Sequence, residues 1–143
     1  MRPEILTFDI FGTVIDWRRG LREALRRHGA EMDDQDFDRV IDLQAELEVE
    51  RFRPYASIVC SSLVQTLGLP PAAARSIGDD AGSWPLYPDA REALRRLRRV
   101  VPCVATTNSD QIHGRQAQRE VGFYLDGWIC AEEVRRYKPD LEF

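Results

Sequence analysis

Three groups of polar residues follow short apolar segments of the chain, and together they could carry out chemistry. They are Asp9, the pair Thr107 and Asn108, and Lys138. A carboxylate such as that of Asp9 can act as a nucleophile if a cation holds and positions it, and Lys138 could be that cation. Thr107 and Asn108 offer hydroxyl, amide and backbone N–H groups, which could bind an anionic group of a substrate.

These side chains need a scaffold that brings distant parts of the chain together, and three apolar segments predict one. Residues 4–8, 102–106 and 128–130 have the composition of short strands. The first is a nearly continuous apolar run, which is typical of a parallel strand buried on both faces. In an open parallel sheet, reactive groups gather just beyond the carboxyl ends of the strands. We therefore predict an α/β fold in which the three polar groups share that edge.

Between the first strand and the other two, residues 15–84 show helical periodicity and no strand pattern. The apolar spacing predicts four helices there, and residues 82–88, which are rich in turn residues, predict a linker. Two more helices separate the remaining strands. We therefore expect an α/β core made of residues 1–14 and 85–143, with a helical cap inserted at residues 15–84.

Three short motifs occur in an order that identifies a family. Residues 8–13, in which Asp is followed at fixed spacing by Gly-Thr, resemble the first motif of the haloacid dehalogenase superfamily. Residues 106–109 resemble the second, a Ser or Thr at the tip of an apolar strand, and residues 137–140 resemble the third, a Lys-Pro pair. The helical insertion matches the superfamily's small cap in position and size. The resemblance implies a Rossmann-like parallel-sheet core with an inserted four-helix cap.

The resemblance also implies a role for each matching residue. Asp9 would be the nucleophile, Thr107 a ligand of the substrate's anionic group, and Lys138 the cation that steadies both. Thr13 would orient the nucleophile or contact the substrate, although turn chemistry after the preceding glycine explains it equally well. Asn108 matches the Asn that follows the second motif residue in the dehalogenase branch, and capping of the next helix explains it equally well.

The residue two positions after the nucleophile distinguishes the branches of this superfamily. Phosphatases carry a second Asp there, which transfers protons as a general acid and base. This chain has Phe11, which cannot do so, whereas a halide leaving group needs no proton. Members that resemble 2-haloacid dehalogenases carry an aromatic residue there, usually Tyr. We therefore expect Asp9 to displace halide from a small 2-halocarboxylate without a cofactor, with Phe11 beside the substrate and water hydrolysing the aspartyl ester.

The cap is expected to complete the substrate site, including a cation for the substrate's carboxylate. Arg39, in the second predicted cap helix, is the candidate, with Arg51 and Arg53 as rivals. Each of the three is explained at least as well as a solvated surface charge. Trp17 either lines the site or packs in the core. The two histidines fit no catalytic pairing and are expected at the surface.

Composition limits the partners that we expect. The chain has 143 residues, 43% hydrophobic and 31% charged, with a net charge of −4 at pH 7. This balance is typical of a globular protein and does not favour a nucleic-acid partner. No apolar run approaches the roughly 20 residues that cross a bilayer, and no signal peptide is evident, so we expect no membrane association. Three cysteines without metal-ligand spacing favour a reduced, cytoplasmic location and are expected to be small buried hydrophobes. The expected partner is a small anionic molecule, and a homodimer is compatible with the sequence.

Two alternatives stay open at this point. One is a Mg²⁺-dependent phosphatase with an atypical first motif, in which Asp9 and a later acidic residue hold the metal. The other is a non-catalytic chain, either a truncated product or an interaction module. The superfamily adds at least two strands and a fourth, acidic motif after the Lys-Pro pair. We therefore expect the chain to be incomplete at its C-terminus, with an unpaired edge on its first strand and little or no turnover by itself.

Overall fold

A three-stranded parallel sheet forms one side of the molecule in the computed structural model, which describes residues 3–143. Its strands are β1 (Leu6–Phe8), β2 (Cys103–Thr107) and β3 (Gly127–Cys130), in the order β1-β2-β3. Both neighbouring pairs are parallel. The three apolar segments therefore form the predicted sheet, with bounds close to those expected.

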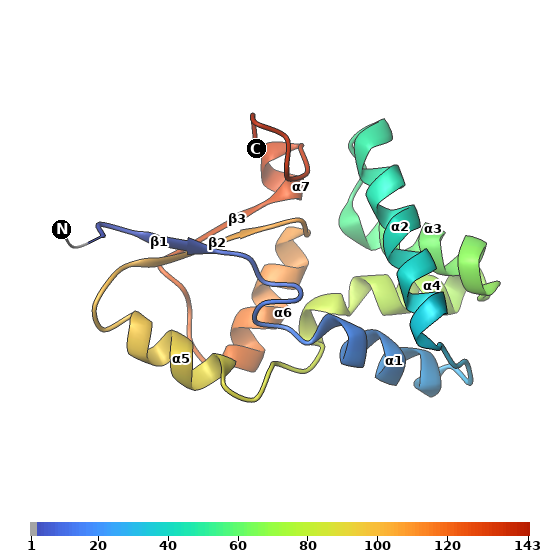
Figure 1. The fold of residues 1–143 in the computed structure, drawn as a ribbon, viewed down its shortest axis with the longest axis horizontal. Helices are drawn as coiled ribbons and strands as arrows, with labels where there is room; N and C mark the ends of the chain where they lie inside the picture. Colours follow the sequence, from blue (N-terminus) through green and yellow to red (C-terminus); the bar gives the residue numbers. More distant parts are fainter. Residues whose placement is uncertain (1–2) are drawn as a thin grey trace.

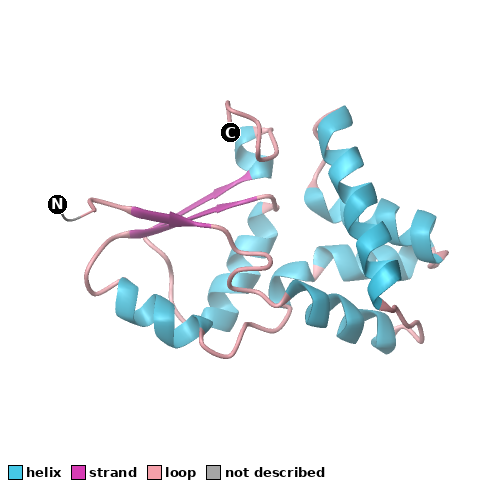
Figure 2. Cartoon of the chain, in the orientation of Figure 1, coloured by secondary structure: helices cyan, strands magenta, loops and turns pink. Residues whose placement is uncertain are grey.

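Helices cover one face of this sheet. In Figure 1, α5 (Ala90–Leu97) and α6 (Gln111–Val121) lie beneath the strands, whereas the short α7 (Ala131–Val134) follows β3 on the other side. The carboxyl ends of the strands point toward the remaining helices, which form a separate, all-helical part of the picture (Figure 2). The edge at which we expected the polar groups therefore faces these helices.

Strand β1 is less buried than its apolar sequence predicts. Ile5, just before the strand, is 52% exposed, and Thr7 is exposed as well. The expectation of burial on both faces was wrong because, among the described residues, β1 is an edge strand that pairs only with β2. Helices α5 and α6 cover one face of the sheet, which leaves part of β1 open to solvent.

The segment between β1 and β2 is helical, as predicted. Residues 15–84 contain α1 (Trp17–Arg27), α2 (Asp34–Glu50), α3 (Tyr55–Leu67), α4 (Pro71–Asp79) and the 3-10 helix η1 (Ala81–Ser83), and α5 follows before β2. Local chemistry sets several of these bounds: Asp33 caps α2 by accepting a hydrogen bond from Asp36 N at 2.7 Å, and Gly68 ends α3 in the left-handed conformation. We call α1–α4 the helical unit. We propose that residues 15–84, which include the helical unit, are a cap domain.

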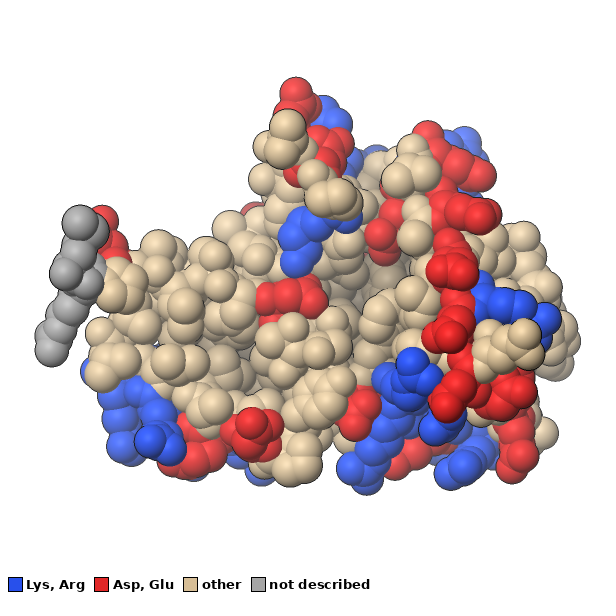
Figure 3. Space-filling model, in the orientation of Figure 1, with Lys and Arg blue, Asp and Glu red and all other residues tan. Residues whose placement is uncertain are grey.

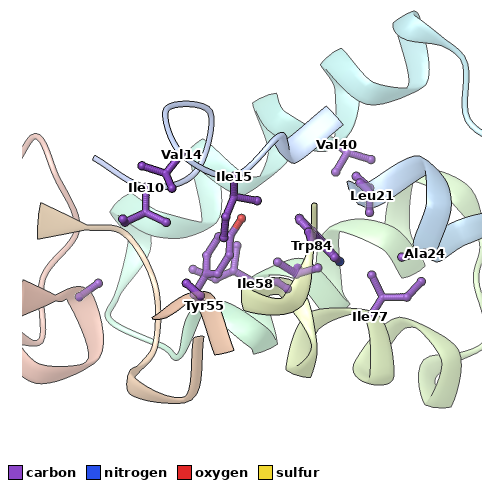
Figure 4. Close-up of a cluster of buried hydrophobic side chains, with 14 of the residues drawn as sticks. Ile10, Val14, Ile15, Leu21, Ala24, Val40, Tyr55, Ile58, Ile77 and Trp84 are labelled. Carbon is purple, nitrogen blue, oxygen red and sulfur yellow. The ribbon is translucent and has the colours of Figure 1, made fainter. Parts of the chain in front are cut away.

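A single cluster of buried apolar side chains joins the sheet side to the helical unit. Figure 4 shows Tyr55 and Ile58 of α3 beside Ile10 and Ile15, which come from the turn after β1. All four are at most 3% exposed. The helical unit and the strand ends therefore share one buried apolar core.

The burial of two residues corrects our expectations. His113 is fully buried, not at the surface: its Nδ1 accepts a hydrogen bond from Asp110 N, and its Nε2 donates to Gly78 O at 2.8 Å. Burial lowers the pKa of His113, so the neutral ring can occupy the interior. Trp84, in the predicted linker, is only 2% exposed because it packs closely against Gly20 of α1. The other histidine is exposed, as expected.

The cysteines follow the expected pattern in part. Cys103 and Cys130 are buried, whereas Cys60 is only partly buried. Within residues 3–143, no helix combines the length and the apolar character that crossing a membrane would require.

Candidate active site

Polar side chains from distant segments meet at the carboxyl edge of the sheet. Asp9 follows β1, Thr107 ends β2, and Lys138 lies in the C-terminal segment, residues 135–143, after α7. Lys138 Nζ lies 2.9 Å from Asp9 Oδ1 and also donates to Thr106 O at 2.5 Å. The side chains of Asp9 and Lys138 are 40% and 31% exposed. The ion pair is therefore held in place but can be reached from outside.

Asn108 holds the backbone of Lys138 in position. Asn108 Oδ1 accepts a hydrogen bond from Lys138 N at 2.7 Å, and Asn108 Nδ2 donates to Lys138 O at 3.1 Å. This reciprocal pair joins the loop after β2 to the C-terminal segment. Asp110 rather than Asn108 occupies the N-cap position of α6, so helix capping does not explain Asn108. Its contact with a substrate stays a prediction.

A cavity of about 220 Å³ lies beside the ion pair. The sheet side contributes Asp9, Phe11, Thr107, Asn108 and Lys138 to its lining. The helical unit contributes Trp17, Ile41, Gln44, Ala45, Glu48 and Tyr55. Pockets for drug-sized ligands measure roughly 300–1,000 Å³, so this cavity suits a smaller molecule.

Phe11 and Thr107, which the sequence also singled out, line the cavity with the ion pair. Phe11 packs against Tyr55, with 5.5 Å between the ring centroids, and so forms an apolar part of the wall. The Oγ1 atom of Thr107 is buried and has no hydrogen-bond partner among the described residues. Because buried polar atoms are usually paired, this hydroxyl has the capacity to bind a substrate group.

Thr13 and Arg39 do not line the cavity. Thr13 is exposed in the turn after β1, where its backbone N–H donates to Ile10 O at 3.2 Å. The guanidinium of Arg39 pairs with Asp36, one turn earlier on α2, and is 60% exposed. The predicted roles of Thr13 and Arg39 are therefore not supported by their positions.

The two rival arginines also lie outside the cavity. Arg53 pairs with Glu50 at 2.7 Å. Arg51 lines an adjoining hollow between the end of α2 and the C-terminal segment. Figure 3 shows the recess between α2 and the C-terminal segment, with acidic and basic side chains at its surface. Within residues 3–143, Lys138 is thus the one cation in the cavity lining.

Glu48 is a candidate functional residue that the sequence analysis missed. It lies on α2, and its Oε2 accepts a hydrogen bond from Asn108 Nδ2 at 3.3 Å. Burial raises the pKa of Glu48 to about 7, although Asn108 and Lys138 act in the opposite direction. The available signal was the spacing of Ile41, Gln44 and Glu48, which places them on one helix face.

The other polar groups of the helical wall bond to each other. Tyr55 OH donates to Gln44 Oε1 at 3.3 Å, and Gln44 Nε2 donates to Ser62 Oγ at 3.1 Å. Burial raises the pKa of Tyr55, so its phenol stays neutral. These groups therefore form part of the wall, and Glu48 is the side chain there that can carry charge.

Asp110 ties the helical unit to the sheet next to the cavity. Its two carboxylate oxygens accept hydrogen bonds from Tyr55 N and Ala56 N, both at 2.8 Å. No side chain within α3 caps the start of that helix, so Asp110 provides the cap from the loop after β2. This contact fixes the end of α3 that carries Tyr55 into the cavity wall.

The residues present do not fit a Mg²⁺ ion. In the part of the chain that the structure describes, no three His, Cys, Asp or Glu side chains gather as a metal site would require. Asp9 bonds to Lys138, and Phe11 stands where a phosphatase would have its second carboxylate. Mg²⁺ takes oxygen ligands, and among the described residues Asp9 and Glu48 are the two carboxylates in the cavity lining.

The chain is similar to known proteins in both sequence and structure. A family model described as haloacid dehalogenase-like hydrolase matches residues 3–143. An L-2-haloacid dehalogenase from Xanthobacter autotrophicus is similar in structure, with a TM-score of 0.84 and 19% identity, over 99% of this chain and 62% of that one. The L-2-haloacid dehalogenase PA0810 has a TM-score of 0.82 and 22% identity, over 99% of this chain and 67% of that one.

A third similar structure is the defluorinating L-2-haloacid dehalogenase Rha0230, with a TM-score of 0.80 and 21% identity, over 97% of this chain and 64% of that one. The chain thus spans 62–67% of the length of these three structures. No curated protein sequence matches it. Identities this low support the α/β fold with a parallel sheet, which the sequence predicted, and leave the substrate to be argued from the site.

Proposed function

This chain belongs to the haloacid dehalogenase-like hydrolases, and we propose that Asp9 is its covalent nucleophile in a dehalogenase-type reaction. The proposed substrate is a small 2-haloacid or a derivative of one, such as its amide. The observation that carries the proposal is the pairing of Asp9 with Lys138 in the lining of a cavity of about 220 Å³. Phe11, two residues after Asp9, supplies no proton donor to that cavity.

In the first step, a carboxylate oxygen of Asp9 forms a bond to the halogen-bearing carbon. The carbon–halogen bond breaks, and the halide leaves with the electron pair. A halide ion is a weak base that needs no proton, so Phe11 does not impede its departure. Lys138 holds the nucleophile in position, and the unpaired hydroxyl of Thr107 can donate to negative charge on the substrate.

In the second step, water attacks the carbonyl carbon of the Asp9 ester. The bond between this carbon and the ester oxygen breaks, and the 2-hydroxy product leaves with the oxygen that Asp9 supplied. The oxygen from water stays in the regenerated Asp9 carboxylate, and one proton is released to solvent. The net reaction consumes one water molecule and releases one halide ion.

The test is halide release from 2-chloropropionate and 2-chloropropionamide with the protein in molar excess over the substrate. Under this condition only the first step is needed, and all of its proposed groups lie within residues 3–143. Halide release should be lost in Asp9→Asn and should be unchanged by EDTA. Release of phosphate from a phosphate ester that depends on Mg²⁺, without any release of halide, would favour the phosphatase alternative.

A further inference from the structure

Glu48 gives the helical wall of the cavity a carboxylate. We propose that Glu48 makes the cavity select substrates whose end facing the helical unit is an uncharged hydrogen-bond donor, such as a primary carboxamide, over those with a free carboxylate there. This inference rests on the proposed function, because it concerns the substrate of the Asp9 reaction. It replaces the small anionic substrate expected from the sequence with a neutral one.

The charges around the cavity support this selection. Among residues 3–143, the lining contains two acidic side chains, Asp9 and Glu48, and one cation, Lys138, which already pairs with Asp9. Arg39 and Arg53 pair with acidic neighbours outside the cavity. A substrate carboxylate that faces Glu48 would therefore meet a like charge in a partly buried space, where repulsion is stronger than in water.

The hydrogen-bonding capacity of the wall points the same way. Among the described residues, Glu48 accepts one hydrogen bond, from Asn108 to Oε2, which leaves Oε1 able to accept another. Gln44 and Tyr55 are already bonded to each other. The NH₂ group of a carboxamide can donate to Glu48, whereas a carboxylate has no hydrogen to donate. A carboxamide also keeps a carbonyl group next to the halogen-bearing carbon, so the displacement step is the same.

The protonation state of Glu48 provides a second way to test the selection. Burial raises its pKa to about 7, so ionised Glu48 predominates well above pH 7 and the protonated acid well below it. Protonated Glu48 can donate to a carboxylate, so discrimination against 2-halocarboxylates should weaken as the pH falls. The other charged or titratable side chains around Glu48 in the cavity and the adjoining hollow are Asp9, Glu50, Arg51, Tyr55, Arg135, Arg136, Tyr137, Lys138 and Asp140. The ratio of the rate constants for the two substrates at each pH cancels the effect of any titration that changes both rate constants equally.

The experiment compares 2-chloropropionate with 2-chloropropionamide at pH 8.5 and pH 5.5, with the protein in excess. Halide release by Asp9→Asn measures the background, including alkylation of thiols, and is subtracted. At pH 8.5 the wild-type protein should favour the amide, and Glu48→Gln should raise the rate constant for the carboxylate by about tenfold or more relative to the amide. Glu46→Gln is the matched control, because Glu46 is exposed on the same helix and lies outside the cavity.

A change of pH should have the same effect on the wild-type protein as the mutation, because it protonates Glu48. Lowering the pH to 5.5 should raise the carboxylate-to-amide ratio of the wild-type protein toward that of Glu48→Gln and should leave the ratio of Glu48→Gln nearly constant. The proposal is overturned if the wild-type protein prefers the carboxylate at pH 8.5, or if Glu48→Gln leaves the ratio within about twofold of wild type. It is also overturned if Arg51→Ala abolishes reaction with the carboxylate alone, because the carboxylate would then bind in the adjoining hollow.

Binding measurements separate failure of this inference from failure of the proposed function. Calorimetry with Asp9→Asn gives the dissociation constants of both compounds without any reaction, and the double variant with Glu48→Gln gives the effect of Glu48. Suppose that halide release depends on Asp9, but Glu48→Gln changes neither the carboxylate-to-amide ratio of rate constants nor that of dissociation constants. This result would overturn the inference alone. No halide release from either compound would overturn the proposed function. Weaker binding of the carboxylate that Glu48→Gln relieves would then still support the selection by Glu48, and equal binding would overturn it as well.

Discussion

Replacing Glu48 by Gln should change the pH dependence of the protein's stability. Glu48 has an ordinary pKa of 4.5, and burial raises its pKa to about 7 in the folded protein. Between these values the folded state holds a proton that the unfolded state has released. The stability that protonated Glu48 provides is therefore fully present below about pH 4.5 and is lost as the pH rises through 7.

The size of this effect follows from the difference between the two pKa values. Each pKa unit corresponds to about 1.36 kcal/mol, so a rise from 4.5 to about 7 corresponds to about 3 kcal/mol. Glu48 is only partly buried, and solvent screening reduces the measurable part to roughly 1–2 kcal/mol. Gln cannot ionise, so Glu48→Gln should gain this amount relative to the wild-type protein between pH 4.5 and pH 8.

Urea unfolding followed by tryptophan fluorescence measures this difference at each pH. Glu46→Gln makes the same change at an exposed position of α2. Its free energy of unfolding should differ from that of the wild-type protein by a nearly constant amount between pH 4.5 and pH 8. A constant difference between Glu48→Gln and wild type across this range would refute the reasoning, because it would mean that Glu48 ionises equally in both states. Taking the difference in the free energy of unfolding between variant and wild type at each pH cancels the pH effects of all groups that the two proteins share.

Three further predictions concern the ion pair, the link between the helical unit and the sheet side, and the packing of α6 against β3. Lys138→Met should lower single-turnover halide release by on the order of 10²-fold, because it removes the cation that holds Asp9; stopped-flow halide detection measures this, and an unchanged rate would contradict the role. Asp110→Ala should lower the free energy of unfolding by roughly 2–4 kcal/mol, because two N–H groups at the start of α3 lose their acceptor; a loss below about 0.5 kcal/mol in urea unfolding would count against it. Gly114→Ala should cost about 1–3 kcal/mol, because a Cβ atom there would lie 2.7 Å from the Trp128 ring; thermal unfolding should show a lower Tm, and an unchanged Tm would contradict this packing.

The sheet edge could be predicted because its chemistry is attached to local sequence patterns. Asp9, Thr107 and Lys138 each follow an apolar segment, and parallel strands bring such positions to one edge. The structure adds the distance of 2.9 Å between Lys138 Nζ and Asp9 Oδ1, which no local pattern contains. Helices α1–α4 were likewise predictable, because their caps and apolar spacing are local features.

The residues that were missed depend on partners far away in the sequence. Asp110 binds the start of α3 across 55 residues, and Glu48 contacts Asn108 across 60. His113 was expected at the surface but is buried, because Gly78 of α4 and Asp110 provide its hydrogen bonds. Arg39 illustrates the reverse case: its place on α2 is as predicted, but the nearby Asp36 pairs with it outside the cavity. Contacts between elements decided the first three, and helix periodicity alone does not describe such contacts; a neighbour on the same helix decided the fourth.

The most direct test of the central claim is the fate of the Asp9 carboxylate during a single turnover in ¹⁸O-labelled water. The protein, in excess, is mixed with 2-chloropropionamide, and peptides that contain Asp9 are analysed by mass spectrometry. We predict that the peptide first gains the mass of the substrate less that of hydrogen chloride, because ester formation also removes the carboxyl proton of Asp9, and that after hydrolysis one ¹⁸O atom is found in the Asp9 carboxylate. Label in the 2-hydroxy product with none in Asp9, and no ester at any time, would show that water attacks the substrate directly and that Asp9 is not the nucleophile.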